Sequence, residues 1–305
     1  MEGGCDRMNK YRFDEALLQC PVCGSRSIGL FETTVNRGAT LHNQICKQCG
    51  MIFLSPRMTA EGMTQFYKSQ YRAHDIESDK PMQWVVEKEQ ERAYYQVELL
   101  VEWVQRPCRF LDVGASSGQL LRMAAERFKC TIIGVEPGDI YRADASRASK
   151  VYPDVEALIA ASEAPFDVIT MSHVLEHLPE PISFLSTLRE HVLKTDGVLF
   201  IEVPNLYGHS CFEPAHLYSF TDKTLTMMLR AAGFAVAKIK IHSAPKDFGW
   251  RNISVLARPS VREYAQRQIF LPAWVKYQRM IGLSGTRHWY GYLYLQARKK
   301  LLKER

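Results

Sequence analysis

The sequence predicts an α/β protein built on a parallel β-sheet, with a small cysteine-rich module in front of it and a basic segment behind it. Three observations predict this arrangement. Short apolar stretches alternate with helical patterns from residue 104 to residue 258, as in a parallel sheet covered by helices. Two Cys-x-x-Cys pairs lie near the N-terminus, between positions 20 and 49. Residues 238–305 hold 15 Lys and Arg against 3 Asp and Glu, so the net charge of +6 arises at this end.

Size and composition favour an intracellular globular protein. A chain of 305 residues suits one catalytic domain with smaller additions. The hydrophobic share of 46% and the charged share of 24% are typical of a globular protein. No apolar run approaches the roughly 18 residues of a membrane span, and the N-terminus lacks a signal-peptide pattern. We therefore expect a cytoplasmic protein that has no disulfides and whose clustered cysteine pairs bind metal.

The first module, residues 1–56, is predicted to be a zinc ribbon. Cys20-Pro-Val-Cys23-Gly and Cys46-Lys-Gln-Cys49-Gly are two copies of one turn, and each presents two thiolates to one point. Strand-like stretches at residues 27–34 and 40–45 lie between the pairs. Four thiolates at this spacing suit a tetrahedral structural zinc, and so short a segment needs the metal in order to fold.

The elements that follow are assigned from periodicity and from end signals. Residues 57–103 read as a polar helical lid or linker, and residues 104–258 as the catalytic domain. Thr221 caps a helix that Gly233 ends. The other expected elements are strands at 109–113, 131–136, 166–171, 198–203, 234–241 and 252–257, and helices at 118–128, 181–193 and 221–232.

A glycine-rich turn follows the first of these strands. It reads Phe-Leu-Asp112-Val-Gly114-Ala-Ser116-Ser-Gly118 and opens a helix, so a cofactor can lie against its backbone at the carboxyl edge of the sheet. Glu136 ends the next strand along the chain, where a carboxylate can bind both hydroxyls of a ribose. An acid at this position suits NAD equally well.

A further segment, Ser172-His173-Val-Leu-Glu-His177-Leu-Pro, distinguishes NAD from a second candidate cofactor. It looks like the segment of class I S-adenosylmethionine-dependent methyltransferases that flanks the adenine and methionine of the cofactor, and the glycine turn resembles their first motif. This resemblance implies a Rossmann-like, seven-stranded sheet. It also implies S-adenosylmethionine binding by Asp112, Gly114, Ser116, Gly118, Glu136, Ser172 and His173.

Residues 20–258 are further similar to the zinc-containing sugar methyltransferases, best known for C-methylating deoxysugars. His177 matches an active-site histidine of that family, and His216 matches the histidine of a Glu-His pair. Tyr71 falls near a lid tyrosine that touches the substrate. Ala215 stands where the family has its catalytic Glu, with Glu213 as the nearest substitute, and the family's second Rossmann-like domain is absent.

These departures favour O-methylation of a sugar hydroxyl. His216, with an expected pKa near neutrality, would be the general base that accepts the hydroxyl proton. The acceptor would be a nucleotide-sugar, a polysaccharide or a glycolipid intermediate. Two alternatives stay open: C-methylation of a nucleotide-linked keto sugar, and methylation of an RNA base with the zinc ribbon gripping nucleic acid. A nucleic-acid partner is not expected, since the ribbon region carries no dense Lys/Arg cluster.

Residues 259–305 are basic and aromatic and are predicted to form a helical extension. The simplest interpretation is a surface helix or two packed on the catalytic domain. The functional alternative is contact with an anionic glycan, a nucleotide-sugar diphosphate, a glycosyltransferase or a membrane surface. The last of these would make the protein peripheral to the membrane.

Overall fold

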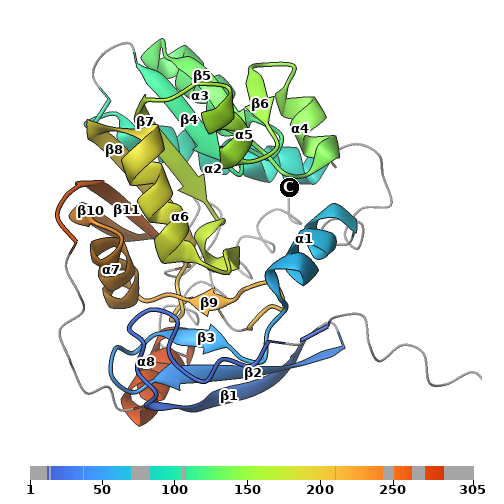
Figure 1. Ribbon diagram of the computed structural model, residues 1–305, viewed down its shortest axis with the longest axis vertical. Helices are drawn as coiled ribbons and strands as arrows, with labels where there is room; N and C mark the ends of the chain where they lie inside the picture. Colours follow the sequence, from blue (N-terminus) through green and yellow to red (C-terminus); the bar gives the residue numbers. More distant parts are fainter. Residues whose placement is uncertain are drawn as a thin grey trace, which may run out of the picture.

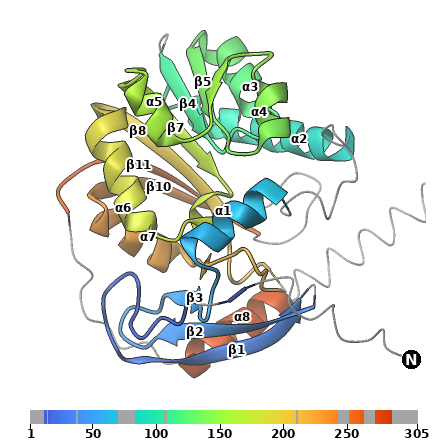
Figure 2. The same cartoon turned by 45° about the vertical axis from the view of Figure 1, so that its right-hand side comes forward.

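The computed structural model describes residues 12–13, 15–36, 38–69, 83–104, 108–209, 211–242, 251–262 and 272–284. Two sheets lie one above the other, with helix α1 (Ala60–Ser69) beside the region between them (Figures 1 and 2). The upper sheet has seven strands and the lower has four. The predicted α/β class is confirmed, and the expected position of a cysteine-rich module in front of the main sheet agrees with this arrangement.

The lower sheet takes one of its strands from the catalytic part of the chain. Its order is β1 (Ile28–Asn36), β2 (Ala39–Cys46), β3 (Ile52–Leu54) and β9 (Tyr218–Ser219), and every neighbouring pair is antiparallel. The two expected strands are therefore present. The boundary at residue 56 describes the module incompletely, because its last strand, β9, comes from within the expected catalytic domain.

The upper sheet has the order β10-β11-β8-β7-β4-β5-β6. The strands are β4 (Arg109–Val113), β5 (Thr131–Val135), β6 (Lys150–Tyr152), β7 (Phe166–Ser172), β8 (Leu193–Pro204), β10 (Phe234–His242) and β11 (Asn252–Pro259). β11 is antiparallel to both of its neighbours, so the sheet is mixed rather than wholly parallel. Only residues 243–251 separate β10 from β11, fewer than the dozen or more that a parallel crossover needs, whereas the earlier strands are joined through helices.

Helices cover both faces of this sheet. They are α2 (Gln83–Leu100), α3 (Gln119–Phe128), α4 (Asp139–Ala145), α5 (Val155–Ala160), α6 (Pro181–Thr187) and α7 (Asp222–Ala231). Neighbouring residues of β4 point to opposite faces: Phe110 joins the core beneath α2 and α3, and Leu111 joins the core beneath α5, α6 and α7. This double burial explains why the strands are apolar throughout.

Local signals set the ends of several helices. Thr221 caps α7 as predicted: its hydroxyl accepts the Thr224 N–H, while the Thr224 hydroxyl accepts the Thr221 N–H. Gly233, just past the helix, has a φ of 84°. The expected helix at 181–193 is shorter, since α6 passes into a π-helical turn at Leu188–Val192 before β8 begins. The sequence did not indicate α4, β6 or α5.

One continuous core joins the lower sheet to the upper sheet. It runs from Phe31 and Phe53 through Tyr218 and Phe220 to the face covered by α7. At the junction, Arg57 is only 1% exposed, and its guanidinium donates to Glu15, to the Tyr218 hydroxyl and to the Pro179 carbonyl. The lower module is thus packed against the rest of the protein, and these contacts stabilise it independently of any metal.

The one described helix of the C-terminal extension, α8 (Pro272–Ser284), lies against the lower sheet (Figure 1). It also contacts the expected catalytic domain, because Gln278 accepts a hydrogen bond from the Tyr207 hydroxyl and Arg279 donates to the His209 carbonyl. Arg279 pairs with Glu32 of β1 at 2.5 Å and lies over the Phe212 ring at 4.2 Å. The aromatic residues beyond position 284 lie outside the described part of the chain. Among the described helices, none combines the length and apolarity that a bilayer crossing demands.

Cys108 and Cys130 form a disulfide, so the expectation of no disulfides is wrong. The two residues directly precede β4 and β5, and the pairing of Arg109 with Thr131 brings their Cα atoms to 4.6 Å. Neighbouring parallel strands thus create a proximity that a separation of 22 in the chain does not reveal.

Candidate active site

The glycine turn after β4 has the backbone that its sequence predicts. Gly114 and Gly118 have φ values of 79° and 78°, and Ser116 also lies in the left-handed region at 48°. A Cβ on Gly114 would lie 2.4 Å from the Val174 side chain, so only glycine allows this close approach. The turn therefore packs against the segment that follows β7.

Glu136 ties this turn to the end of β5. One carboxylate oxygen accepts the Ser116 N–H at 2.8 Å, and the other accepts the Gly138 N–H at 2.9 Å. A second carboxylate, Glu89 of α2, accepts the hydroxyls of Ser116 and Ser117, each at 2.6 Å. Sequence reasoning missed Glu89, because it is one of several acids in a polar helical run and nothing local singles it out.

Asp112 is buried beside the turn and accepts a hydrogen bond of 2.7 Å from the Thr170 hydroxyl. Burial, together with the negative charges of Glu136 and Glu89, raises the pKa of Asp112 to about 7, although the Thr170 hydrogen bond opposes this. The three carboxylates Asp112, Glu136 and Glu89 make the surroundings of the turn suitable for a positively charged ligand. S-adenosylmethionine carries both a sulfonium and an ammonium group.

The end of β7 contributes the next two predicted residues. The Ser172 hydroxyl accepts a hydrogen bond from Gln96 of α2, which also donates to the buried Glu202 at 3.1 Å. His173 has a φ of 54°, and its ring lies between Glu176, at 3.4 Å, and Glu202, at 3.7 Å. Burial and Arg92 act to lower the pKa of His173, but these two carboxylates leave it raised. His173 thus bridges two buried acids.

His177 and His216 come together although they belong to separate segments of the chain. Their ring centroids are 4.8 Å apart, and Glu176 lies within reach of both. We call Glu176, His177 and His216 the Glu-His-His cluster. One ligand-type atom from each of the three side chains lies within 4.8 Å of the others. The resemblance implied that the two histidines share a site, and their positions agree with it.

Backbone contacts hold the two halves of this cluster together. Leu217 N–H donates to the Glu176 carbonyl at 2.8 Å, and His177 Nδ1 lies 2.9 Å from the Ala215 carbonyl. Leu175–His177 form a 3₁₀ turn directly after Val174, which contacts Gly114. The cluster therefore lies next to the glycine turn, at the carboxyl edge of the sheet.

Burial shifts the titration of both histidines away from neutrality. It lowers the pKa of His177 and that of His216 to about 4, with Glu176 opposing the shift in each case. The expectation of a pKa near neutral for His216 is therefore wrong. Burial would raise the pKa of Glu176, but the neighbouring His173 and His177 lower it to about 2. At neutral pH the cluster offers two neutral imidazoles and one carboxylate.

Two further predicted site residues, Glu213 and Tyr71, are not part of the Glu-His-His cluster. Glu213 is partly exposed, and its carboxylate lies 3.8 Å from His216 Nε2, so it is a neighbour of the cluster. Tyr71 lies outside the described residues. Sequence reasoning gave no role to Glu176 or Glu202, although one acid within an apolar strand or turn signals a buried polar partner.

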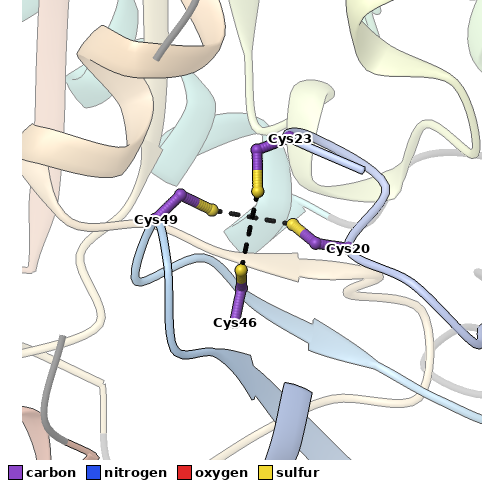
Figure 3. A group of neighbouring side chains, drawn as sticks. All are labelled: Cys20, Cys23, Cys46 and Cys49. Atoms are coloured by element: carbon purple, nitrogen blue, oxygen red, sulfur yellow. Dashed lines mark hydrogen bonds between the residues drawn. The ribbon is translucent and has the colours of Figure 1, made fainter. Parts of the chain in front are cut away.

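The four cysteines of the lower module converge on one point (Figure 3). Cys20 and Cys49 sulfurs are 3.6 Å apart, as are those of Cys23 and Cys46. A tetrahedral zinc with bonds of about 2.3 Å needs sulfur–sulfur distances of about 3.8 Å. The geometry of these four thiols thus fits such an ion with closed coordination.

Comparison with known proteins identifies the upper domain. A family model described as a methyltransferase domain matches residues 85–239, just over half of the chain. A solved structure, 1,6-didemethyltoxoflavin-N1-methyltransferase of Burkholderia thailandensis with bound S-adenosylhomocysteine, superimposes with a TM-score of 0.53. It is 19% identical and covers 69% of this chain and 96% of its own, a likeness that establishes the fold.

Curated relatives match a shorter stretch. The ubiquinone biosynthesis O-methyltransferase of Actinobacillus pleuropneumoniae serotype 5b is 33% identical over 109 residues, covering 32% of this chain and 46% of the relative. The enzyme of the same name from Neisseria meningitidis serogroup C is 27% identical over 157 residues, covering 43% and 66%. The chain thus spans between about half and two thirds of these relatives.

Proposed function

This chain belongs to the S-adenosylmethionine-dependent methyltransferases, and we propose that it methylates a hydroxyl oxygen of a sugar. The acceptor would be a nucleotide-sugar, a polysaccharide or a glycolipid intermediate. The observation that carries the proposal is the Glu-His-His cluster, formed beside the glycine turn by two separate segments. The relatives named O-methyltransferases also favour oxygen as the acceptor atom.

In this reaction the acceptor oxygen attacks the methyl carbon and the S–CH₃ bond breaks, with its electron pair passing to sulfur. The hydroxyl proton leaves into the cluster, where His216 is the candidate acceptor. The sulfonium is already activated, so aligning the two reactants provides much of the acceleration. Asp112, Gly114, Ser116, Gly118, Glu136, Ser172 and His173 are the proposed cofactor residues.

C-methylation of a keto sugar is the second candidate, and one observation favours it. Ala215 stands where the resembling family has its catalytic acid, yet Glu176 supplies a buried carboxylate within 4.8 Å of His216. A carboxylate and an imidazole together could remove a proton from carbon next to a carbonyl. The two candidates differ in the bond that forms and in whether that carbon loses its proton.

Nuclear magnetic resonance can decide between them. Purified protein, S-adenosylmethionine and a panel of nucleotide-sugars in deuterated water should give a methyl ether and no deuterium at carbon. Exchange at the carbon next to a carbonyl, lost in His216→Ala, would reject O-methylation. We expect His216→Ala to lower kcat about 100-fold with near-normal cofactor affinity. His209→Ala, in the same loop but outside the cluster, is the matched control.

We also propose that Cys20, Cys23, Cys46 and Cys49 hold one structural zinc ion. The sulfur–sulfur distances of 3.6 Å and the closed thiolate set support this. Elemental analysis of the purified protein should find one tightly held zinc at these cysteines, lost in the double variant Cys23→Ser/Cys49→Ser. A purified wild-type protein that contains no zinc, and takes up none when zinc is added, would contradict the proposal.

A further inference from the structure

We propose that Glu176, His177 and His216 bind a divalent transition-metal cation, at a site separate from the four cysteines. This inference deepens the proposed function and rests on it for the role of the cation. One carboxylate and two imidazoles are the donors that such cations prefer, and three protein ligands leave coordination positions for an acceptor oxygen. The spacing of the ligand atoms, an orphaned carboxylate and the support of the ligand rings all point to such a site.

The spacing is close to what coordination needs. Glu176 Oε1 and His177 Nε2 are 3.9 Å apart, and ligand atoms from all three side chains lie within 4.8 Å of one another. Bonds of about 2.1 Å in a tetrahedral arrangement place neighbouring ligand atoms about 3.4 Å apart. Small side-chain rotations therefore suffice to close the set around an ion.

The second observation is the burial of the Glu176 carboxylate. It is 1% exposed, and neither of its carboxylate oxygens has a hydrogen bond of good geometry to any residue that the structure describes. Its nearest polar contact among the described residues is His173 Nδ1, at 3.4 Å. His173 is shared with Glu202, so this ion pair compensates the buried Glu176 carboxylate only in part, and buried carboxylates characteristically pair or coordinate a metal.

His177 is oriented as metal-binding histidines are. The Ala215 carbonyl can only accept, so His177 Nδ1 carries the proton of their 2.9 Å hydrogen bond and the lone pair lies on Nε2, toward Glu176. Metal-ligating histidines usually donate their other ring N–H to a carbonyl or carboxylate in this way. Glu213 lies beside the second imidazole, with its carboxylate 3.8 Å from His216 Nε2, which is beyond hydrogen-bonding distance.

The frame around the cluster is rigid. The loop that carries His216 continues into β9, which pairs with β3, and Leu217 N–H bonds the Glu176 carbonyl. Both histidines are therefore fixed by backbone pairing on either side. In the cation-bound protein His216 would be a ligand rather than the proton acceptor. The cation would hold the acceptor hydroxyl and lower its pKa, so that the proton leaves to solvent as the O–CH₃ bond forms.

Metal titration of the full-length protein, with its cysteine site already filled, tests the inference. We expect Co²⁺ to bind in one further equivalent by calorimetry, with a visible spectrum that lacks the thiolate-to-cobalt band of a cysteine site. Glu176→Gln and His216→Asn should each weaken this equivalent at least tenfold, with unchanged circular dichroism. His209→Ala should bind like the wild type.

Saturation at the cysteine equivalent alone would overturn the inference. So would wild-type Co²⁺ affinity in both folded variants, Glu176→Gln and His216→Asn. Because the readout is binding, it is independent of the methylation assay. A protein that takes up the second equivalent but forms no methyl ether on any sugar would refute the proposed function and leave the metal site standing.

Discussion

Replacing Gly114 by alanine would introduce two separate penalties that the structure allows us to size. The residue has a φ of 79°, and an added Cβ would meet Val174 Cγ2 at 2.4 Å. The left-handed backbone costs a non-glycine residue about 1–2 kcal/mol. Forcing a methyl group into a packed contact costs about 1–3 kcal/mol more. We therefore expect Gly114→Ala to lower the free energy of unfolding by about 2–5 kcal/mol.

Gly38 provides a matched control for the first penalty. Its φ is 80°, but a Cβ there would meet nothing within 4 Å, so Gly38→Ala should cost only the backbone penalty of about 1–2 kcal/mol. Urea unfolding followed by circular dichroism measures both variants. Adding Val174→Ala to Gly114→Ala should recover the packing penalty but not the backbone penalty. A double-mutant cycle reports the recovered packing penalty as a coupling free energy between the two positions. Equal losses in the two glycine variants, with no coupling to Val174, would refute the reasoning.

Three further outcomes are expected. Glu136→Ala should weaken S-adenosylmethionine binding at least tenfold by calorimetry, about 1.4 kcal/mol, and unchanged binding would contradict its ribose role. The pKa of Asp112 is raised to about 7, so between the unfolded pKa and pH 7 the folded state keeps a proton that the unfolded state loses. The stability that this proton confers declines as pH rises and is gone once pH has passed through 7. From pH 5 to pH 8 the wild type should lose about 2 kcal/mol more unfolding free energy than Asp112→Asn, and parallel curves would exclude this titration. Cys23→Ser/Cys49→Ser should slow methyl transfer although neither residue is in the Glu-His-His cluster, because β9 links the module to His216. A metal-free double variant with wild-type turnover would disprove that link.

The elements and the cofactor turn could be predicted because their signals are local. A short apolar run, two glycines that need a left-handed backbone and a threonine cap act within a few positions, and β4, Gly114, Gly118 and Thr221 all appear as expected. The spacing of the two Cys-x-x-Cys pairs also predicted a four-cysteine cluster, and the four sulfurs lie together in the structure.

The remainder depended on contacts between distant segments. A strand as short as β9 has no periodicity to detect, and only its pairing with β3 defines it. Glu176 reads as an ordinary acid until the fold buries it against His216, and the same burial lowers the histidine pKa below the expected value. Sequence similarity placed His177 and His216 in one site, but it could not assign a partner to either ring.

The sharing of β9 also bears on the order in which a growing chain can fold. The amino-terminal module leaves a ribosome well before Tyr218 is made, so the edge of β3 stays unpaired and Arg57 lacks its Tyr218 and Pro179 acceptors until then. Contacts that close so long a stretch of chain form late, because loop entropy must be overcome first. The module is therefore synthesised before the upper sheet but is among the last parts to be completed, and the loop that leads into its final strand is the one that carries His216.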